Sequence, residues 1–308
     1  MNKIIIGVDV GGTNTKCGLV DTRGRVVDRA RIDTRQYLSK QSLLFSAIVD
    51  TVLGLIQKYR GERSDILGVG MGLPGLIDTE KGIVRILPNI PGWRNVPLQR
   101  MMEDRLGLPT RIENDVNLIT LGEWKYGAGI GCRNLVCMTL GTGVGSGLIL
   151  DNRLYRGEGF AAGEIGHMPL KRHGLKCNCG GSACFERYVG NTVLVKKARR
   201  LFRDKTITLE QVSLLAARED PRAVAFWHET AVTVGDALTG VVNLLNPRLI
   251  IIGGGVANAH RFLFKTITDT IRARAMTVQG AMFVIKRANL GDDAGLIGAR
   301  VLVDNPDL

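Results

Sequence analysis

Three cysteines and one histidine lie close together in the middle of this 308-residue chain. His167 precedes Cys177, Cys179 and Cys184 in the run AGEIGHMPLKRHGLKCNCGGSACFE. Three thiolates and one imidazole complete a tetrahedral shell, so this spacing predicts a structural Zn²⁺ with no coordination position left for a reacting molecule. The alternative from the same residues is a set of reduced cysteines on a mobile turn.

Two acidic residues flank the predicted zinc loop. Glu164 lies three residues before the histidine, and Glu186 lies two residues after the last cysteine. Ionised carboxylates accept hydrogen bonds from adjacent hydroxyl groups in pairs. We therefore expect a site for a hydroxyl-rich ligand beside the metal, with a metal-binding loop that has no ligand as the alternative.

Two glycine-rich turns occupy matching positions in the two halves of the chain. One reads Asp9-Val-Gly-Gly-Thr-Asn-Thr-Lys16, and the other reads Gly141-Thr-Gly-Val-Gly-Ser-Gly147. Glycine lets backbone N–H groups approach phosphate oxygens closely, and threonine adds a hydroxyl donor. Either turn alone is typical of a plain hairpin. Two of them, with a third glycine cluster at 253–255, predict phosphate binding.

The expected nucleotide contacts combine backbone donors with nearby charge. Lys16 supplies a positive charge, and Asp9 is placed to reach a Mg²⁺ directly or through water. The full set is Asp9, Gly11, Gly12, Thr13, Asn14, Lys16, Gly141, Thr142, Gly143, Gly145, Gly254 and Gly255.

Asp115 is the candidate general base. It lies in the run Arg-Ile-Glu-Asn-Asp-Val-Asn at a strand-to-helix junction, where the helix dipole favours an ionised carboxylate. Such a carboxylate can take the proton of a hydroxyl group during phosphoryl transfer. The alternative is an aspartate that only caps the helix.

An alternation of strands and helices must position these residues. Apolar patterns predict strands at 4–8, 17–20, 66–71, 110–112, 135–140, 148–150, 249–252 and 282–286. They predict helices at 41–59, 96–106, 116–126, 186–202, 209–218 and 221–245, and from about 258 and 293. Each half of the chain begins with a strand, a glycine turn and a second strand. This internal duplication predicts two similar α/β domains, with a boundary at 116/117 and the last helix packing back on the first domain.

Composition limits the class of protein. Apolar residues make up 45 % of the chain, which suits a globular enzyme with a large core. The net charge of +12 suggests the hypothesis of nucleic-acid binding. However, the basic residues are dispersed, and the densest run, KKARR at 196–200, is typical of a solvated helix face. No segment suggests a signal peptide or membrane span, and the scattered cysteines favour a reducing cytoplasm.

The ordered motifs resemble the ROK family of repressors, open reading frames and sugar kinases. The resemblance runs from about residue 4 to 302. It is carried by the first glycine turn, Glu113-Asn-Asp-Val-Asn117, Leu140-Gly-Thr-Gly-Val-Gly145, Gly163-Glu-Ile-Gly-His167, and Cys177-Asn-Cys-Gly-Gly-Ser-Ala-Cys-Phe-Glu186. Two positions depart from the family pattern: Ala183 replaces a glycine before the last cysteine, and Val116 replaces an alanine.

The resemblance implies an actin/hexokinase-like fold, in which two ribonuclease-H-like domains flank a cleft that binds sugar and ATP. It implies Asp115 as the catalytic base and a dual role for His167, with one ring nitrogen on zinc and the other on the sugar. The implied sugar contacts are Asn89, Asn114, Asp115, Glu164, His167 and Glu186.

The function implied by the resemblance is an ATP-dependent glucose kinase, cytoplasmic and homodimeric, with Mg²⁺ and structural Zn²⁺. Kinases for N-acetylmannosamine, N-acetylglucosamine, fructose or allose are alternatives. A sugar-responsive repressor is less expected, because the chain begins directly at the first strand without a helix-turn-helix segment. A sugar-binding protein without turnover is a further alternative.

Overall fold

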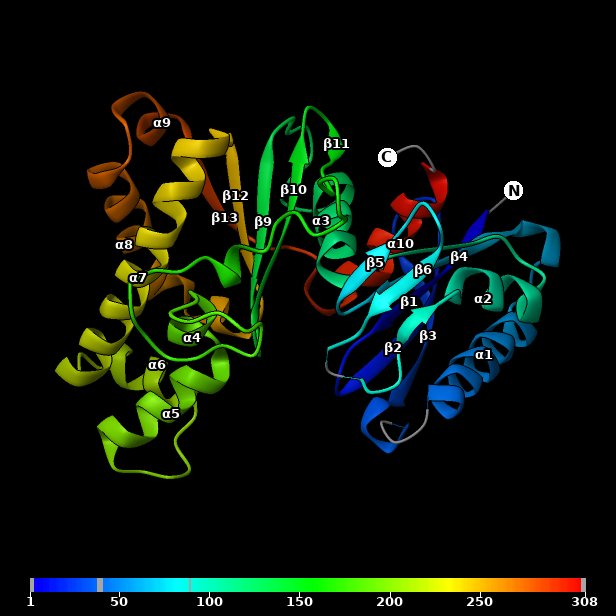
Figure 1. Cartoon of the computed structure of the whole chain (residues 1–308), viewed down its shortest axis with the longest axis horizontal. Helices are drawn as coiled ribbons and strands as arrows, with labels where there is room; N and C mark the ends of the chain where they lie inside the picture. Colours follow the sequence, from blue (N-terminus) through cyan, green and yellow to red (C-terminus); the bar gives the residue numbers. More distant parts are fainter. Residues whose placement is uncertain (1–2, 38–40, 89, 306–308) are drawn as a thin grey trace. The chain divides into compact units, whose positions relative to one another are not determined.

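The computed structural model describes residues 3–37, 41–88 and 90–305 and has an α/β fold with mixed sheets (Figure 1). It divides into two compact units. Unit 1 comprises Met1–Gly131, Gly147–Ala162 and Asn289–Leu308; unit 2 comprises Cys132–Ser146 and Gly163–Ala288. Each unit therefore joins segments that are far apart in sequence. The domain boundary expected at 116/117 stays a prediction.

The main sheet of unit 1 combines a meander with two parallel strands. Its order is β3-β2-β1-β4-β8. The antiparallel meander contains β1 (Ile4–Val10), β2 (Asn14–Val20) and β3 (Val26–Asp33). Strands β4 (Ile66–Leu73) and β8 (Thr110–Asn114) continue parallel to β1. The pairing of β1 with β2 confirms the hairpin predicted around the first glycine turn.

In the described part of unit 1, four helices accompany this sheet. They are α1 (Gln41–Lys58), α2 (Leu98–Leu106), α3 (Asp115–Tyr126) and α10 (Ala294–Asp304). Helix α1 buries Leu44, Ile48 and Val52 in the core, as its 3.6-residue apolar spacing requires. Helix α10 contacts β1, β4 and α3.

A small antiparallel sheet was not anticipated by the sequence. It contains β5 (Leu76–Asp78), β6 (Ile83–Ile86) and β7 (Arg94–Val96). Strands of three or four residues carry too few alternations to produce a clear period of two, which explains the omission.

The second five-stranded sheet repeats the pattern of the first. Its order is β11-β10-β9-β12-β13. The strands are β9 (Leu135–Leu140), β10 (Val144–Leu150), β11 (Arg153–Leu154), β12 (Leu249–Gly253) and β13 (Val284–Arg287). Strands β9, β12 and β13 are mutually parallel, as β1, β4 and β8 are. Matching orders support the duplication inferred from the glycine turns.

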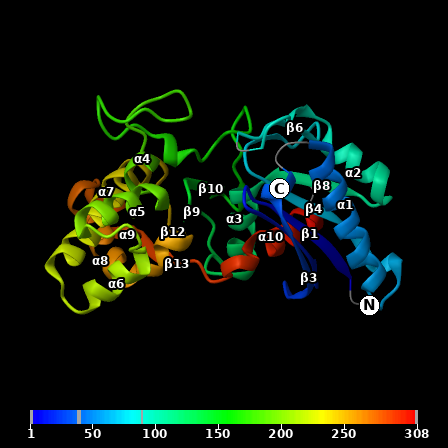
Figure 2. The ribbon, with the colours of Figure 1, turned by 90° about the horizontal axis from the view of Figure 1, so that it is seen from below.

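Six helices belong to unit 2, and α7 and α8 pack side by side (Figure 2). They are α4 (Glu186–Val189), α5 (Asn191–Phe202), α6 (Leu209–Ala217), α7 (Pro221–Leu245), α8 (His260–Arg274) and α9 (Thr277–Met282). Short 3₁₀ helices connect elements in both units: η1 (Thr34–Tyr37), η2 (Arg63–Asp65), η3 (Ile165–His167), η4 (Gly255–Ala259) and η5 (Gly291–Asp293).

Two expectations for unit 2 were wrong. The single helix expected at 186–202 is interrupted at Gly190, whose ψ of 144° is extended. The strand expected at 282–286 begins only at Val284, because the preceding residues form α9. Among the described residues, no helix has both the length and the apolar composition needed to span a membrane.

Glycines allow α10 to lie directly against α3. A Cβ atom on Gly298 would overlap the carbonyl oxygen of Leu118, and one on Gly122 would lie 2.5 Å from the carbonyl oxygen of Ala294. Neither neighbour is a flexible side chain, so the two backbones would have to separate to accept a methyl group.

We predict that Gly298→Ala lowers the free energy of unfolding by about 2–3 kcal/mol, because overpacking forces the helices apart. Gly240→Ala, at an exposed position of α7, is the matched control, since its Cβ would meet nothing within 4 Å. That control should stabilise the protein by about 0.5–1 kcal/mol through helix propensity. Urea unfolding measures both changes, and equal effects would contradict the proposed close packing.

Candidate functional site

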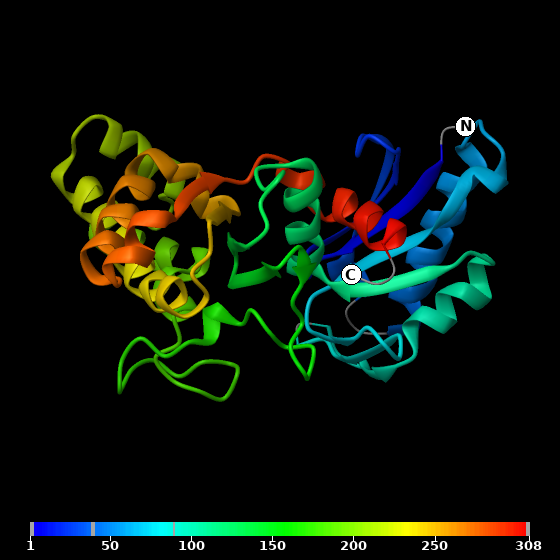
Figure 3. The same ribbon diagram turned by 90° about the horizontal axis from the view of Figure 1, so that it is seen from above.

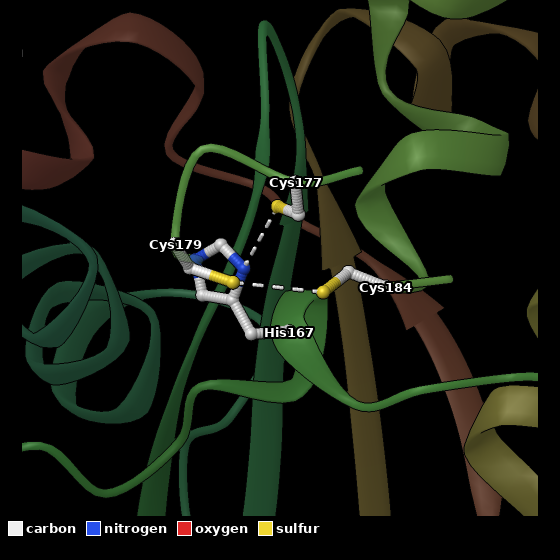
Figure 4. Close-up of side chains that lie close together, drawn as sticks. All are labelled: His167, Cys177, Cys179 and Cys184. Carbon is white, nitrogen blue, oxygen red and sulfur yellow. Dashed lines mark hydrogen bonds between the residues drawn. The ribbon is translucent and has the colours of Figure 1, made fainter. Parts of the chain in front are cut away.

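The four predicted metal ligands converge in unit 2 (Figure 4). Their ligand atoms all lie within 4.8 Å of one another. Cys177 Sγ is 3.7 Å from His167 Nδ1, and Cys179 Sγ is 3.6 Å from Cys184 Sγ. Ligands about 2.3 Å from a tetrahedral zinc ion lie about 3.8 Å apart, so these separations fit a Cys₃His shell.

The ligands lie at the end of η3 and on the loop that connects η3 to α4, whose green ribbon can be followed in Figure 3. Cys177 donates its N–H to Gly181 O and accepts from Gly180 N–H, which closes a tight turn around Cys179. Hydrogen bonding from Gly181 N–H and contact with the neighbouring thiols lower the pKa of Cys179. The turn therefore favours the thiolate form that binds a metal.

Ala183 occupies a backbone conformation suited to glycine. Its φ is +57° and it is fully buried. This is the position where the chain departs from the family's glycine, so the loop keeps the left-handed conformation at a steric cost of about 1–2 kcal/mol. The substitution does not prevent Cys184 from joining the cluster.

The two acidic residues beside the loop lie in the same unit. Glu164 Oε2 is 3.8 Å from His167 Nε2, so the two ring nitrogens of His167 face different partners. Burial raises the pKa of Glu164; His167 opposes this rise and Glu186 adds to it. Glu186 also accepts a 2.9 Å hydrogen bond from Val144 N–H.

The second glycine turn connects β9 to β10 and contacts Glu186. Gly141 N–H donates to Gly143 O over 2.9 Å, and a Cβ on Gly143 would overlap the Glu186 carboxylate. Thr142, between them, is exposed, and Gly145 follows the turn as the second residue of β10. Residues predicted for phosphate and for sugar are thus adjacent within unit 2.

The third glycine cluster lies beside this turn. Strands β9 and β12 are parallel neighbours, and a Cβ on Gly254 would overlap the carbonyl oxygen of Leu140. Gly254 has a φ of +84°, whereas Gly255 faces open space. Ligands in α/β folds bind outside the carboxyl ends of such parallel strands.

A cavity of about 230 Å³ opens next to Gly255. It also contacts Val256, Asn258, Leu209 and Trp227. The cavity residues on α6 and α7 were not expected from the sequence, because they belong to regular amphipathic helices. Only the packing of α6 against η4 and against α7 brings these residues to the glycine cluster.

The first glycine turn belongs to unit 1 and ends in the pair Asp9–Lys16. These residues are directly opposite each other on β1 and β2. Burial raises the pKa of Asp9; Lys16 opposes this rise, and Asp292 adds to it. Lys16 Nζ donates to the carbonyl oxygen of Asp292 over 2.9 Å. Backbone of Gly295 at the start of α10 lies against the Asp9 side chain.

The rest of this turn is open. Gly11 N–H donates to Asn14 O over 3.0 Å, whereas Gly12 and Thr13 are exposed. A Cβ on Gly12 would meet nothing within 4 Å. The turn therefore leaves backbone groups accessible to a ligand.

Asp115 is the first residue of α3, and Asn114 is the residue that caps the helix. Asn114 Oδ1 accepts hydrogen bonds from Val116 N–H at 2.9 Å and Asn117 N–H at 3.1 Å. Asp115 Oδ1 also accepts from Val116 N–H. The capping duty thus does not account for Asp115, which keeps its carboxylate in the positive field of the helix N-terminus.

Glu113 and Arg156 form a buried ion pair that sequence reasoning missed. Arg156 Nε lies 2.7 Å from Glu113 Oε2, and the exposed fraction of the glutamate side chain is 2 %. The two residues are distant in sequence, and no local pattern links them. Both lie in unit 1, next to Asn114.

The predicted site residues are distributed over both units. Unit 1 holds the first turn with Asn114 and Asp115, and unit 2 holds the metal ligands, Glu164, Glu186 and the other glycine clusters. Asn89, the remaining expected sugar contact, lies outside the described residues.

Comparisons with known proteins agree over nearly the whole chain. The model of the ROK family matches residues 5–305. A glucokinase of Halalkalibacterium halodurans is 36 % identical, with 97 % of this chain and 94 % of the relative covered. A xylose repressor of Bacillus spizizenii is 28 % identical, with 97 % of this chain but 76 % of the repressor covered.

Among solved structures, a ROK family glucokinase from Streptomyces griseus in complex with glucose and AMPPNP is similar to this chain. It has a TM-score of 0.81 and 33 % identity, with 96 % of this chain and 97 % of the other covered. The motifs, their arrangement and these similarities lead to one conclusion: the chain belongs to the ROK family.

Proposed function

We propose that this chain is an ATP-dependent hexose kinase of the glucokinase type, which transfers the γ-phosphoryl group of ATP to the 6-hydroxyl of glucose. Similarity to glucokinases along the full chain supports this activity. The observation that carries it is the placement of Asp115 on the first turn of α3, with Asn114 providing the cap. A panel of hexoses with ATP and Mg²⁺, compared by kcat/KM, tests it.

Asp115 is proposed as the general base. Its carboxylate would accept the proton of the attacking hydroxyl as the bond from oxygen to phosphorus forms and the bond to ADP breaks. The helix N-terminus favours the ionised form of this carboxylate before the reaction. Most of the remaining rate enhancement in phosphoryl transfer comes from positioning and charge stabilisation.

The sugar contacts are proposed as Glu164, His167 and Glu186 from unit 2 with Asn114 from unit 1. His167 would give Nδ1 to the metal and Nε2 to a sugar hydroxyl, consistent with the different surroundings of its two nitrogens. Asn89 is proposed on the family resemblance alone.

The nucleotide is proposed to bind along the glycine clusters. Backbone N–H groups of the two hairpin turns would cradle the phosphates, with Lys16 adding charge. The 230 Å³ cavity beside Gly255 is large enough for an adenine base. Asp9 would hold Mg²⁺, whose preferred ligands are carboxylate and water oxygens, and the ion would offset phosphate charge.

A structural Zn²⁺ is proposed for the Cys₃His cluster. The donor types and their separations fit this ion, which would order the loop that follows Glu164 and His167. The fold is proposed to consist of two ribonuclease-H-like domains that flank a cleft, as in actin and hexokinase. We also propose a cytoplasmic homodimer that does not bind nucleic acid.

Two other functions are separable by experiment. A kinase for N-acetylmannosamine, N-acetylglucosamine, fructose or allose would show its highest kcat/KM on that sugar. The similarity to xylose repressors keeps a sugar-responsive repressor as an alternative, although this chain covers only 76 % of that relative. Sugar binding without ADP release would indicate a protein without turnover.

We predict that the parent protein contains about one zinc ion per chain and that Cys179→Ser contains less. The variant should also bind glucose more weakly, because the loss of one thiolate ligand weakens the Cys₃His coordination shell. Cys132→Ser, at a cysteine outside the cluster, is the control and should keep its zinc. Atomic absorption and glucose titration measure the two effects. Full zinc occupancy in Cys179→Ser, or none in the parent protein, would rule out the assigned site.

We predict that Asp115→Asn lowers kcat by roughly 10²- to 10⁴-fold while glucose still binds, because the amide keeps the shape of the side chain but not its basicity. Asp50→Asn, at an exposed aspartate of α1, is the control and should leave kcat unchanged. ADP release and glucose titration provide the readouts. Turnover within a few-fold of the parent would show that Asp115 is not the base.

A further inference from the structure

We propose that Arg156 is a positioning residue for catalysis, which acts through Glu113 on the residues that carry and orient Asp115. This inference rests on the proposed kinase function. Arg156 lies just after β11, 41 positions from Asp115 in sequence, and none of the motifs that mark the family includes it.

The carboxylate of Glu113 accepts hydrogen bonds from three residues of unit 1. Its Oε1 accepts from Asn114 N–H at 2.8 Å and from Asn117 Nδ2 at 2.9 Å. Its Oε2 accepts from Arg156 Nε at 2.7 Å. With an exposed fraction of 2 %, this carboxylate depends on those donors for its stability as an anion.

The hydrogen bonds continue from Glu113 to the first turn of α3, which carries Asp115. Asn114, whose N–H is bound to Glu113, uses Oδ1 to cap α3 and Nδ2 to donate to Gly75 O at 3.2 Å. Asn117, bound through its side chain, lies in the first turn of the same helix. Glu113 thus holds the residues on both sides of Asp115, and its charge is balanced by Arg156.

Arg156 is itself fixed by its loop. Its carbonyl oxygen accepts from Ala162 N–H at 2.9 Å, and Gly157 between them has a φ of +72°. The exposed fraction of the arginine side chain is 17 %. Gly163 and Glu164 follow this loop directly in sequence, so the ion pair ties the strand before Asp115 to the segment that leads to a proposed sugar contact.

A cavity of about 620 Å³ gives access to this arginine from the side of Arg111, Tyr155 and Glu158. The cavity lies within unit 1 and contains none of the expected sugar or ATP contacts. A small guanidinium compound could therefore enter the space left by a shortened side chain. This allows the role of the charge to be tested separately from the role of the covalent chain.

The first experiment measures kinetics and thermal unfolding of Arg156→Ala. We expect kcat per folded molecule to fall roughly 10- to 100-fold, a range typical of a displaced catalytic group, with the KM for ATP changed by no more than about twofold. Arg156→Lys should recover only part of kcat, because an ammonium group cannot reproduce the planar Nε contact. Arg153→Ala, at an exposed arginine three residues earlier, is the control and should match the parent protein.

The double variant Glu113→Gln/Arg156→Ala separates positioning from simple charge balance. It removes the unpaired buried charge, so thermal stability should return toward that of the parent. We expect kcat to remain low, because the side chain at position 113 is no longer held by Arg156. If kcat returns together with stability, the pair only balances charge and the proposal is wrong.

Chemical rescue supplies the second test. Millimolar ethylguanidinium should raise kcat of Arg156→Ala several-fold and saturably, without affecting the parent or Arg153→Ala. No rescue, or an equal effect on all three proteins, would overturn the positioning role. Absence of hexose phosphorylation by the parent protein would instead refute the proposed function, so the two failures are distinguishable.

Discussion

The close approach of α10 to the sheet and to α3 is the constraint on which unit 1 depends. Gly7 and Gly70, on β1 and β4, lie against the backbone of α10, and Gly122 on α3 does the same. Side chains at these positions would overlap backbone atoms, which cannot move aside as a flexible side chain can. Helix α10, near the end of the chain, therefore completes a core that also contains Ile4, at the start of β1.

That packing also sets the electrostatics near the first glycine turn. Because Gly295 lies against Asp9, the start of α10 faces the end of β1. Burial of Asp9 raises the pKa of its carboxyl, and Lys16 partly offsets this effect. A divalent cation would stabilise the ionised form further, which gives a physical reason for a buried acidic side chain beside the turn that we propose to bind phosphate.

Unit 2 contains a long irregular loop, which must be held in place by interactions other than regular secondary structure. The loop between η3 and α4 contains no regular element among its residues, and its two isolated bridges pair Pro169 with Cys184 and Lys176 with Ser182. Scattered backbone hydrogen bonds, among them Leu170 N–H to Ala183 O and Ala183 N–H to Leu175 O, hold the rest of the loop. A metal ion bound to the four ligand atoms would cross-link both ends of the loop. Glu164 and Glu186, which flank those ends, would then be held in place.

The helices with strong apolar periodicity, such as α7, and the Cys/His spacing of the candidate metal site were predictable from local signals in the sequence. The sequence also identified both glycine turns, since a turn is encoded by adjacent residues. The folded chain was needed to show that Asn114, and not Asp115, caps α3, because asparagine and aspartate are about equally favoured at the N-cap position. The Glu113–Arg156 pair and the passage of α10 across α3 also required the folded chain. Contacts between residues that are distant in sequence leave no periodic trace, so packing alone specifies them.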